Sequence, residues 1–255
     1  MGLWIIRTMD NRTMNDRKRQ LEVLPDLAAL VARALEQVMA VAEEAIAQRG
    51  QFTLALAGGS TPKPLYGAIA QQNLPWDAVH VFWGDERYVP ASHPDSNEGM
   101  ARQAWLDQVP IPPSNIHAMP TDEADPALAA ERYDATLHRF FGTTAGDFPA
   151  LDLILLGMGD DGHTASLFPH TSALQVRDRL ITVGNKDGQP RLTFTAPFIN
   201  QARHVLFLVA GENKQPALSH VFAPDDDAAL YPSRLIQPQG SLTWLLDAAA
   251  GRSLP

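Results

Sequence analysis

The amino-acid sequence predicts an α/β protein with a single domain, in which helices flank a doubly wound, mainly parallel sheet. Short apolar runs that are typical of buried strands alternate along the chain with amphipathic helical segments, and this alternation indicates a parallel sheet. Several of these runs end in turns that carry glycine, hydroxyl or charged residues, at the edge where such sheets bind ligands. The length of 255 residues suits one domain of this class and does not require two.

The first half of the sequence supplies a long helix and two strands that end in polar turns. Apolar residues recur every three or four positions from Pro25 to Gln48, which predicts one buried helix face, and Gly50 ends the helix. Pro62 suits the first turn of the next helix, because no helical partner exists there for a backbone N–H. In chain order we expect a helix over 25–48, a strand over 52–57, a turn over 58–62, a helix over 63–71 and a strand over 79–83.

The second half repeats this pattern after a Pro-rich connection at 109–113. The run 151–156 is almost continuously apolar, as expected for a strand that is buried on both faces. Ser241 suits the N-cap of a helix, since its hydroxyl can accept a backbone hydrogen bond. We expect a helix over 122–141, a strand over 151–156, a strand over 204–210, a short last strand over 234–236 and a closing helix over 241–250.

The N-terminal stretch is polar and differs in composition from the remainder. We expect residues 1–24 to form a partly disordered extension and residues 25–255 to form the domain. The dense basic cluster at 17–19 lies in this stretch, where a solvated terminus explains it better than a binding arm. No internal repeat or low-complexity tract is present in the sequence.

Composition excludes several classes of function. The net charge of −9 argues against nucleic acid as the main partner, because binding the phosphate backbone requires a basic face. The absence of cysteine excludes disulfides, thiolate metal sites and cysteine nucleophiles. No apolar run approaches the ~20 residues that span a bilayer, and the chain opens without a basic segment before an apolar core. We therefore expect a soluble, cytoplasmic protein with no nucleic-acid or membrane partner.

The most informative segment follows the apolar run 151–156, where glycines, carboxylates and a histidine stand close together. His163 is the best candidate for a general base, since its unperturbed pKa lies near neutrality. Asp161, two residues earlier, can orient the imidazole ring or hold a water molecule. An ordinary glycine turn with an incidental histidine explains the segment equally well when it is taken alone.

Two other strand ends carry groups that suit a phosphate. The turn 58–62 offers two glycines and two hydroxyls before a helix, although a plain tight turn explains it about as often. It matches neither the dinucleotide fingerprint nor the Walker A pattern, so neither NAD nor ATP is inferred. Lys214 and Arg191 each stand at the end of a strand-like run and can supply positive charge. Either residue alone is more often a solvated surface cation.

The segment 83–87 places two carboxylates and a guanidinium at the end of a strand. Arg87 can stabilise a developing oxyanion there, or the segment can be a local surface ion pair. Metal binding by Asp85, Asp161 and His163 is a rival interpretation. We favour it less, because no His-x-x-x-His pattern and no thiolate completes a ligand set.

Four separated segments together resemble one family, the 6-phosphogluconolactonases, which share a superfamily with the glucosamine-6-phosphate isomerases/deaminases. The resemblance extends from the predicted helix at residue 25 to the segment 241–247. Each motif is modest alone, but the combination is highly specific. The segments are Leu56–Pro62, Trp83–Arg87 with Asp95–Asn97, Gly157–Pro169, and Arg191–Thr193 with Lys214.

This resemblance implies a modified Rossmann-like fold and the hydrolysis of 6-phospho-D-glucono-1,5-lactone in the oxidative pentose phosphate pathway, without a metal or organic cofactor. In this role His163 is the base that activates water, Asp161 its neighbouring carboxylate and Arg87 a stabiliser of developing charge. The residues implied for catalysis are His163, Asp161, Arg87 and Asp85. The residues implied for phosphate binding are Gly58, Gly59, Ser60, Thr61, Arg191 and Lys214.

Two alternatives stay open at this stage. The first is a glucosamine-6-phosphate isomerase/deaminase, since the sister enzymes share the Asp-Gly-His step. In the deaminase pattern a glutamate stands five residues after the histidine, whereas this chain has Phe168, which cannot transfer a proton. The second is a non-catalytic sugar-phosphate-binding regulatory module, which the intact Asp161 and His163 disfavour. The sequence leaves open whether the protein is a monomer or a small homo-oligomer.

Overall fold

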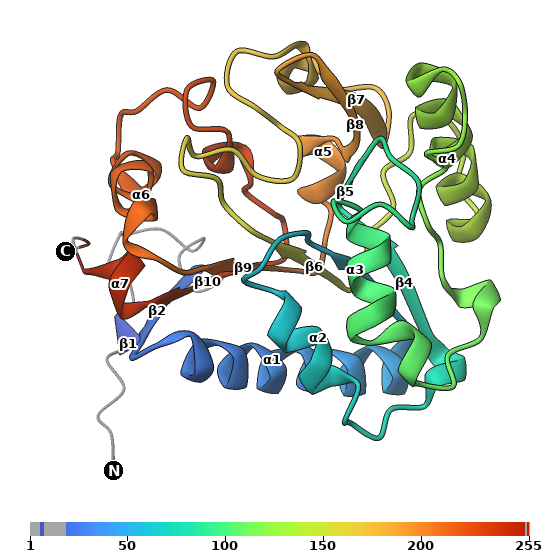
Figure 1. Ribbon diagram of the computed structural model, residues 1–255, viewed down its shortest axis with the longest axis horizontal. Helices are drawn as coiled ribbons and strands as arrows, with labels where there is room; N and C mark the ends of the chain where they lie inside the picture. The colour runs from blue at the N-terminus through green and yellow to red at the C-terminus, as the bar shows by residue number, and fades with distance from the viewer. Residues whose placement is uncertain (1–5, 8–18, 253, 255) are drawn as a thin grey trace.

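The computed structural model describes residues 6–7, 19–252 and 254, and it confirms the predicted α/β fold (Figure 1). The central sheet has seven strands in the order β1-β2-β10-β9-β6-β3-β4, and all neighbours are parallel except β1 with β2. A second sheet of three antiparallel strands, β5-β8-β7, stands above it in Figure 1. The central strands are buried on both faces, which explains their nearly continuous apolar sequences.

The strands are β1 (Ile6–Arg7), β2 (Arg19–Leu24), β3 (Phe52–Leu56), β4 (Val79–Trp83), β5 (Asp85–Arg87), β6 (Leu153–Leu156), β7 (Ile181–Lys186), β8 (Gln189–Phe194), β9 (His204–Val209) and β10 (Ser241–Asp247). The helices are α1 (Leu27–Arg49), α2 (Lys63–Ile69), α3 (Asn97–Ala104), α4 (Pro126–Phe141), α5 (Ala196–Ile199), α6 (Gln215–Phe222) and α7 (Ala248–Gly251). Among them, α1 and α2 lie along the lower face of the central sheet in Figure 1. None of the helices in the described part of the chain could cross a membrane.

The long helix α1 forms where the apolar spacing predicts it. Its buried residues, Leu30, Ala34, Val38, Ala42 and Ala45, make one face that packs on the sheet. The side chain of Asp26 accepts a hydrogen bond from the Ala29 N–H at 2.8 Å and caps the N-terminus. At the other end Gly50 adopts a left-handed conformation with φ 74°, which a glycine enters without strain.

Residues 19–24 correct the predicted boundary of the N-terminal extension. They form β2, an inner strand that pairs in parallel with β10 and buries Leu21 and Leu24. Its one buried carboxylate, Glu22, accepts two hydrogen bonds from the Arg33 guanidinium of α1. The sheet therefore begins before residue 25. The rest of the predicted extension, residues 1–5 and 8–18, lies outside the described residues.

The predicted ending of the chain is wrong in two places. Ser241 starts strand β10 instead of capping a helix, and the short α7 that follows is capped by Asp247. The leucines of β10 stand at 242, 245 and 246, a spacing that fits a helix as well as a strand buried on both faces. Residues 234–236 do not form a strand either. The turn there is a short 3-10 helix, Pro232–Leu235, in which the Arg234 guanidinium binds backbone carbonyls at the end of α6.

The outer strand β4 carries a cluster of aromatic rings that includes two histidines. His80 Nδ1 lies 3.2 Å from His117 Nε2, and the His117 ring stacks on Phe82 with the ring centroids 4.4 Å apart. The Phe140 ring contacts both histidines edge-on. Burial, together with the nearby His80, lowers the pKa of His117 from 6.5 to about 4.

This cluster predicts a stability that depends on pH. Because the folded pKa of His117 is below its unfolded value, unfolding takes up a proton between pH 6.5 and 4, and the free energy of unfolding falls as pH decreases through that range. Partial exposure screens the charge, so we expect a loss of about 1–2 kcal/mol in urea titrations between pH 7 and 5. His117→Gln should flatten this dependence, whereas the same change at the exposed His93 should not. An equal slope for wild type and His117→Gln would contradict the prediction.

Candidate active site

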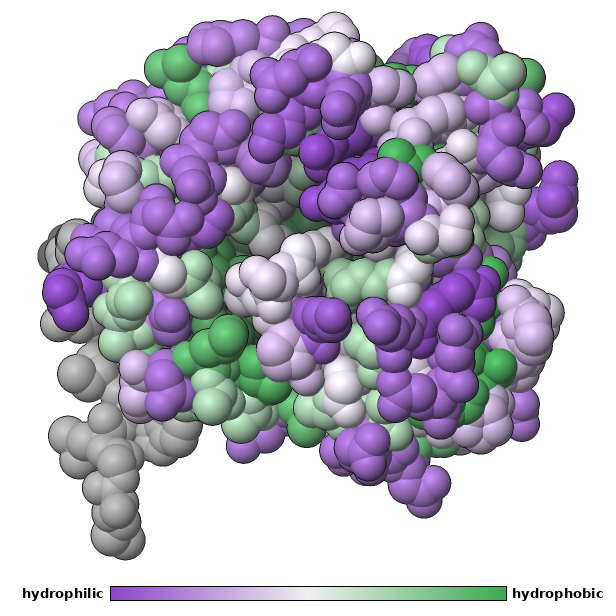
Figure 2. All heavy atoms as spheres, viewed as in Figure 1, coloured by the Kyte–Doolittle hydropathy of each residue, from purple (hydrophilic) through white to green (hydrophobic). Residues whose placement is uncertain are grey.

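A cavity of about 290 Å³ opens at the carboxyl ends of β3, β4, β6 and β9, below the small sheet. Figure 2 shows the surface hollowed near the centre of this face, with hydrophilic residues around the hollow. Many of the lining residues carry polar groups or belong to glycine turns, and the fold brings ten of particular interest together from distant parts of the chain. They are Gly58, Gly59, Ser60, Thr61, Asp85, Arg87, Asn97, His163, Arg191 and Lys214.

The structure therefore gathers nine of the ten predicted site residues around one cavity, and Asp161 is the exception. Asp161 does not line the cavity but lies behind His163 and contacts it directly. Sequence reasoning missed Asn97 and Lys186, which also line the cavity. The motif Asp95–Asn97 is part of the family resemblance, but the resemblance implies no role for the Asn97 side chain. Lys186 had no signal, because it lies in the β7–β8 hairpin, away from the motifs.

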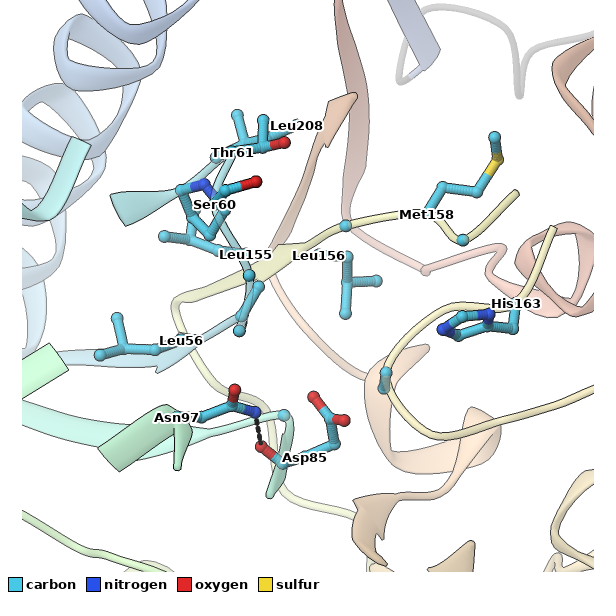
Figure 3. Close-up of a pocket in the computed structure, with 18 of the residues that line it drawn as sticks. Leu56, Ser60, Thr61, Asp85, Asn97, Leu155, Leu156, Met158, His163 and Leu208 are labelled. Atoms are coloured by element: carbon cyan, nitrogen blue, oxygen red, sulfur yellow. Dashed lines mark hydrogen bonds between the residues drawn. The ribbon is translucent and has the colours of Figure 1, made fainter. Parts of the chain in front are cut away.

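The turn after β3 has a backbone that approaches its neighbours closely. A Cβ at Gly58 would lie 2.0 Å from Asn97 Oδ1, and Gly59 adopts φ 97°, so glycine is required at both positions. The buried hydroxyl of Tyr66 donates to the Ala57 carbonyl at 2.6 Å and fixes the start of the turn. Ser60 and Thr61 face the cavity at the end of this turn, as Figure 3 shows.

His163 lies in a closed loop after β6. Its carbonyl accepts the Gly159 N–H at 2.9 Å, and a Cβ at Gly159 would lie only 2.0 Å from His163 Nδ1. At the next glycine, Gly162, φ is 78° and the carbonyl accepts the Ser233 N–H at 2.9 Å. These contacts hold the loop at both ends, so the imidazole is presented to the cavity from a fixed backbone (Figure 3).

Asp161 determines which nitrogen of the neutral His163 ring carries the proton. Its Oδ1 lies 2.5 Å from His163 Nδ1 and accepts the His163 backbone N–H at 3.0 Å. Burial raises the pKa of Asp161, but the hydrogen bonds from the ring and backbone of His163 outweigh it and lower the pKa to about 2. An ionised carboxylate only accepts hydrogen bonds, so Nδ1 carries the proton and Nε2 carries the free lone pair.

Asp85 is a buried carboxylate in the cavity wall. Its Oδ2 accepts a hydrogen bond from the fully buried Ser166 hydroxyl at 2.6 Å. Its backbone carbonyl accepts from Asn97 Nδ2 at 2.9 Å, the contact drawn in Figure 3. Two separate segments therefore orient Asp85, from the loop after His163 and from the start of α3.

The neighbouring Glu86 points away from the cavity and has a structural role. Its two oxygens accept the backbone N–H groups of Arg87, Asn97 and Glu98 at 2.7–2.8 Å. Burial raises the pKa of Glu86, and these backbone hydrogen bonds oppose that rise. Glu86 thus holds the N-terminus of α3 against β5 and thereby places Arg87 and Asn97 at the cavity.

Two cations of the cavity, Arg191 and Lys186, lie over the ring of Phe168. Arg191 Cζ lies 5.5 Å and Lys186 Nζ lies 5.7 Å from its centroid, within the range of cation–π attraction. The His163 ring packs on the same side chain, with centroids 4.3 Å apart. Burial and the nearby Arg87 lower the pKa of Arg191. The gathering of positive groups around an apolar ring suits an anionic ligand.

The geometry does not support the rival metal interpretation. Among the residues that the structure describes, no three His, Asp or Glu side chains are grouped so that they could hold a metal ion. Asp85 is directed to Ser166 and Asp161 to His163, so the three proposed ligands do not converge.

The fold and the cavity together define an α/β protein with a cavity at the carboxyl ends of its parallel strands, lined by lysine and arginine side chains. A family model described as glucosamine-6-phosphate isomerases/6-phosphogluconolactonase matches residues 25–244. The chain belongs to this family.

Curated relatives cover almost the whole chain. It is 66% identical over 237 residues to a 6-phosphogluconolactonase of Nostoc sp., which covers 93% of this chain and 99% of the relative. It is 64% identical over 235 residues to a 6-phosphogluconolactonase of Synechocystis sp., covering 92% and 98%. Among solved structures, the 6-phosphogluconolactonase of Trypanosoma brucei superposes with a TM-score of 0.81 at 29% identity, covering 92% of this chain and 98% of that one.

Proposed function

We propose that the chain hydrolyses 6-phospho-D-glucono-1,5-lactone to 6-phosphogluconate, with His163 as the general base. The observation that carries this proposal is the Asp161–His163 contact of 2.5 Å at the cavity wall, which leaves the ring with a free lone pair at Nε2. The lactonase activity is supported by relatives that carry that name along nearly their whole length. From that name we also propose a place in the oxidative pentose phosphate pathway. We propose a cytoplasmic location on the grounds given in the sequence analysis.

In the proposed reaction Nε2 of His163 takes a proton from a water molecule as the water oxygen adds to the lactone carbonyl carbon. Arg87 stabilises the negative charge that develops on the carbonyl oxygen. The tetrahedral intermediate then collapses, the bond from this carbon to the ring oxygen breaks, and the imidazolium returns its proton to that oxygen. Because a lactone is already an activated ester, a base and an oriented substrate suffice and no covalent nucleophile is needed.

The phosphate of the substrate is proposed to bind between the turn after β3 and the cations Arg191 and Lys214. The turn Gly58–Thr61 supplies backbone N–H groups and two hydroxyls, and Arg191 and Lys214 supply positive charge. Asp85, held by Ser166, is placed to accept a hydrogen bond from a sugar hydroxyl. This arrangement orients the lactone carbonyl toward His163.

The direct test follows the hydrolysis of lactone that is generated in situ, above its spontaneous rate. We expect rapid turnover by the wild-type protein. Turnover at the background rate, together with tight binding of 6-phosphogluconate, would instead identify a non-catalytic sugar-phosphate-binding module. Ammonia release from glucosamine 6-phosphate would identify a deaminase.

The contacts of Phe168 give a testable prediction. In Phe168→Glu the new carboxylate would face His163, Lys186 and Arg191, and it would neutralise cations that the phosphosugar needs. We expect kcat/KM for the lactone to fall by about tenfold or more, which corresponds to about 1.4 kcal/mol of lost stabilisation. Phe168→Leu, which adds no charge, is the matched control. If both variants lose activity equally, the effect is loss of packing and the electrostatic argument is wrong.

A further inference from the structure

Lys214 differs from the other cations of the cavity because its ammonium group forms an ion pair with a carboxylate. Its Nζ donates to Asp160 Oδ1 at 2.5 Å, and Asn213 Nδ2 donates to the same oxygen at 2.9 Å. Within the described part of the chain, Arg87, Arg191 and Lys186 form no ion pair with a carboxylate. The Lys214 side chain is 18% exposed, whereas that of Asp160 is 62% exposed, so the pair reaches from solvent into the cavity wall.

The position of Asp160 connects this ion pair directly to the loop after β6 that carries His163. Asp160 precedes Asp161, which binds His163, so two consecutive carboxylates hold two different functional groups. The Lys214 hydrogen bond is the largest of the contacts that lower the pKa of Asp160, which is therefore ionised at neutral pH. Lys214 directly precedes α6, so the pair also ties this helix to the loop after β6.

We propose that Asp160 is a positioning residue that holds Lys214 at the cavity and competes with the substrate phosphate for its ammonium group. This inference rests on the proposed function, in which Lys214 binds phosphate. A bound phosphate dianion carries about −1.5 to −2 charges and three acceptor oxygens, so it can displace a single carboxylate. The competition weakens phosphate binding, which favours release of the product, and Asp160 returns Lys214 to its place when the phosphate leaves.

The experiment compares the binding of inorganic phosphate to the wild type and to Asp160→Asn by isothermal titration calorimetry. The amide oxygen of asparagine can still accept from Lys214, so this change removes the competing charge and keeps an acceptor. We expect the Kd for phosphate to fall about twofold to fivefold, as for the loss of one partly exposed ion pair. Asp178→Asn makes the same change in net charge at an ion pair outside the cavity, and its Kd should equal that of the wild type.

Two further measurements separate competition from a merely structural role. Asp160→Asn should lower KM for the phosphorylated lactone but leave KM for unphosphorylated gluconolactone unchanged. On a Lys214→Met background, the effect of Asp160→Asn on phosphate binding should disappear, because the two residues act through one contact. A well-folded Asp160→Asn that binds phosphate no better than wild type, or an effect that persists on the Lys214→Met background, would overturn the proposal.

The failure of this inference can be distinguished from failure of the proposed function, because phosphate binding needs no lactone. A wild-type protein that binds phosphate but does not hydrolyse the lactone would refute the proposed function and leave the competition between Asp160 and phosphate standing. A wild-type protein that hydrolyses the lactone, with an Asp160→Asn variant that binds phosphate more weakly, would refute the competition alone.

Discussion

His163→Ala is expected to lower kcat for lactone hydrolysis by about 10²–10⁴-fold, because a positioned general base contributes a factor of that size. The ring of His163 reaches the cavity from a loop held by its own backbone hydrogen bonds, so its removal should leave the loop in place. KM should change little, since the proposed phosphate contacts come from other segments. The measurement is the rate of hydrolysis of lactone generated in situ, corrected for the spontaneous reaction.

A matched control for this variant is His204→Ala. His204 is the first residue of β9, at the opposite end of the strand from the cavity, and its ring Nδ1 lies 2.7 Å from Ser241 Oγ. This variant should keep the wild-type kcat even if its stability falls slightly. Circular dichroism and thermal unfolding should show both variants folded. A well-folded His163→Ala with near wild-type turnover would exclude His163 as the base.

Most of the central sheet could be predicted from the sequence because its strands are buried on both faces. The runs that form β3, β4, β6 and β9 are apolar and end in polar turns, so local composition and position in the fold agree. The same rule explains the failure at β10. Its leucine spacing fits a helix, and only pairing with β2 and β9, far away in sequence, makes it a strand.

The sequence predicts which side chains lie in the candidate site better than it predicts their hydrogen-bond partners. Parallel strands place their carboxyl ends together, so Asp85, His163 and Lys214 could be expected at one edge without knowledge of any distance. Their partners could not be predicted. Ser166 binds Asp85 because the chain turns sharply after His163, where Ala165 adopts φ 47°, and no spacing in the sequence signals that contact. Lys186 reaches the cavity only because of the register of the β7–β8 hairpin.

Asp161→Asn should lower kcat by about 10²–10⁴-fold although Asp161 does not line the cavity. The carboxylate holds the proton on Nδ1 and stabilises the imidazolium that forms as water is deprotonated, whereas a neutral amide does neither as well. The pKa of Asp161 is lowered from 3.8 to about 2, so its contribution to the free energy of unfolding is complete above pH 3.8 and is lost only as pH falls toward 2. Protonation of Asp161 should therefore not limit activity in assays at pH 5 to 8.

The double variant provides the decisive measurement for this pair. If Asp161 acts through His163, the combination of Asp161→Asn with His163→Ala should be no slower than His163→Ala alone. Once the His163 ring is removed, Asp161 has no base to orient, so its own replacement has no further effect. The neighbouring Asp160→Asn should instead change KM, since Asp160 binds Lys214 and not the imidazole. A further large loss of kcat in the double variant would mean that Asp161 acts on the substrate or the water by a route of its own.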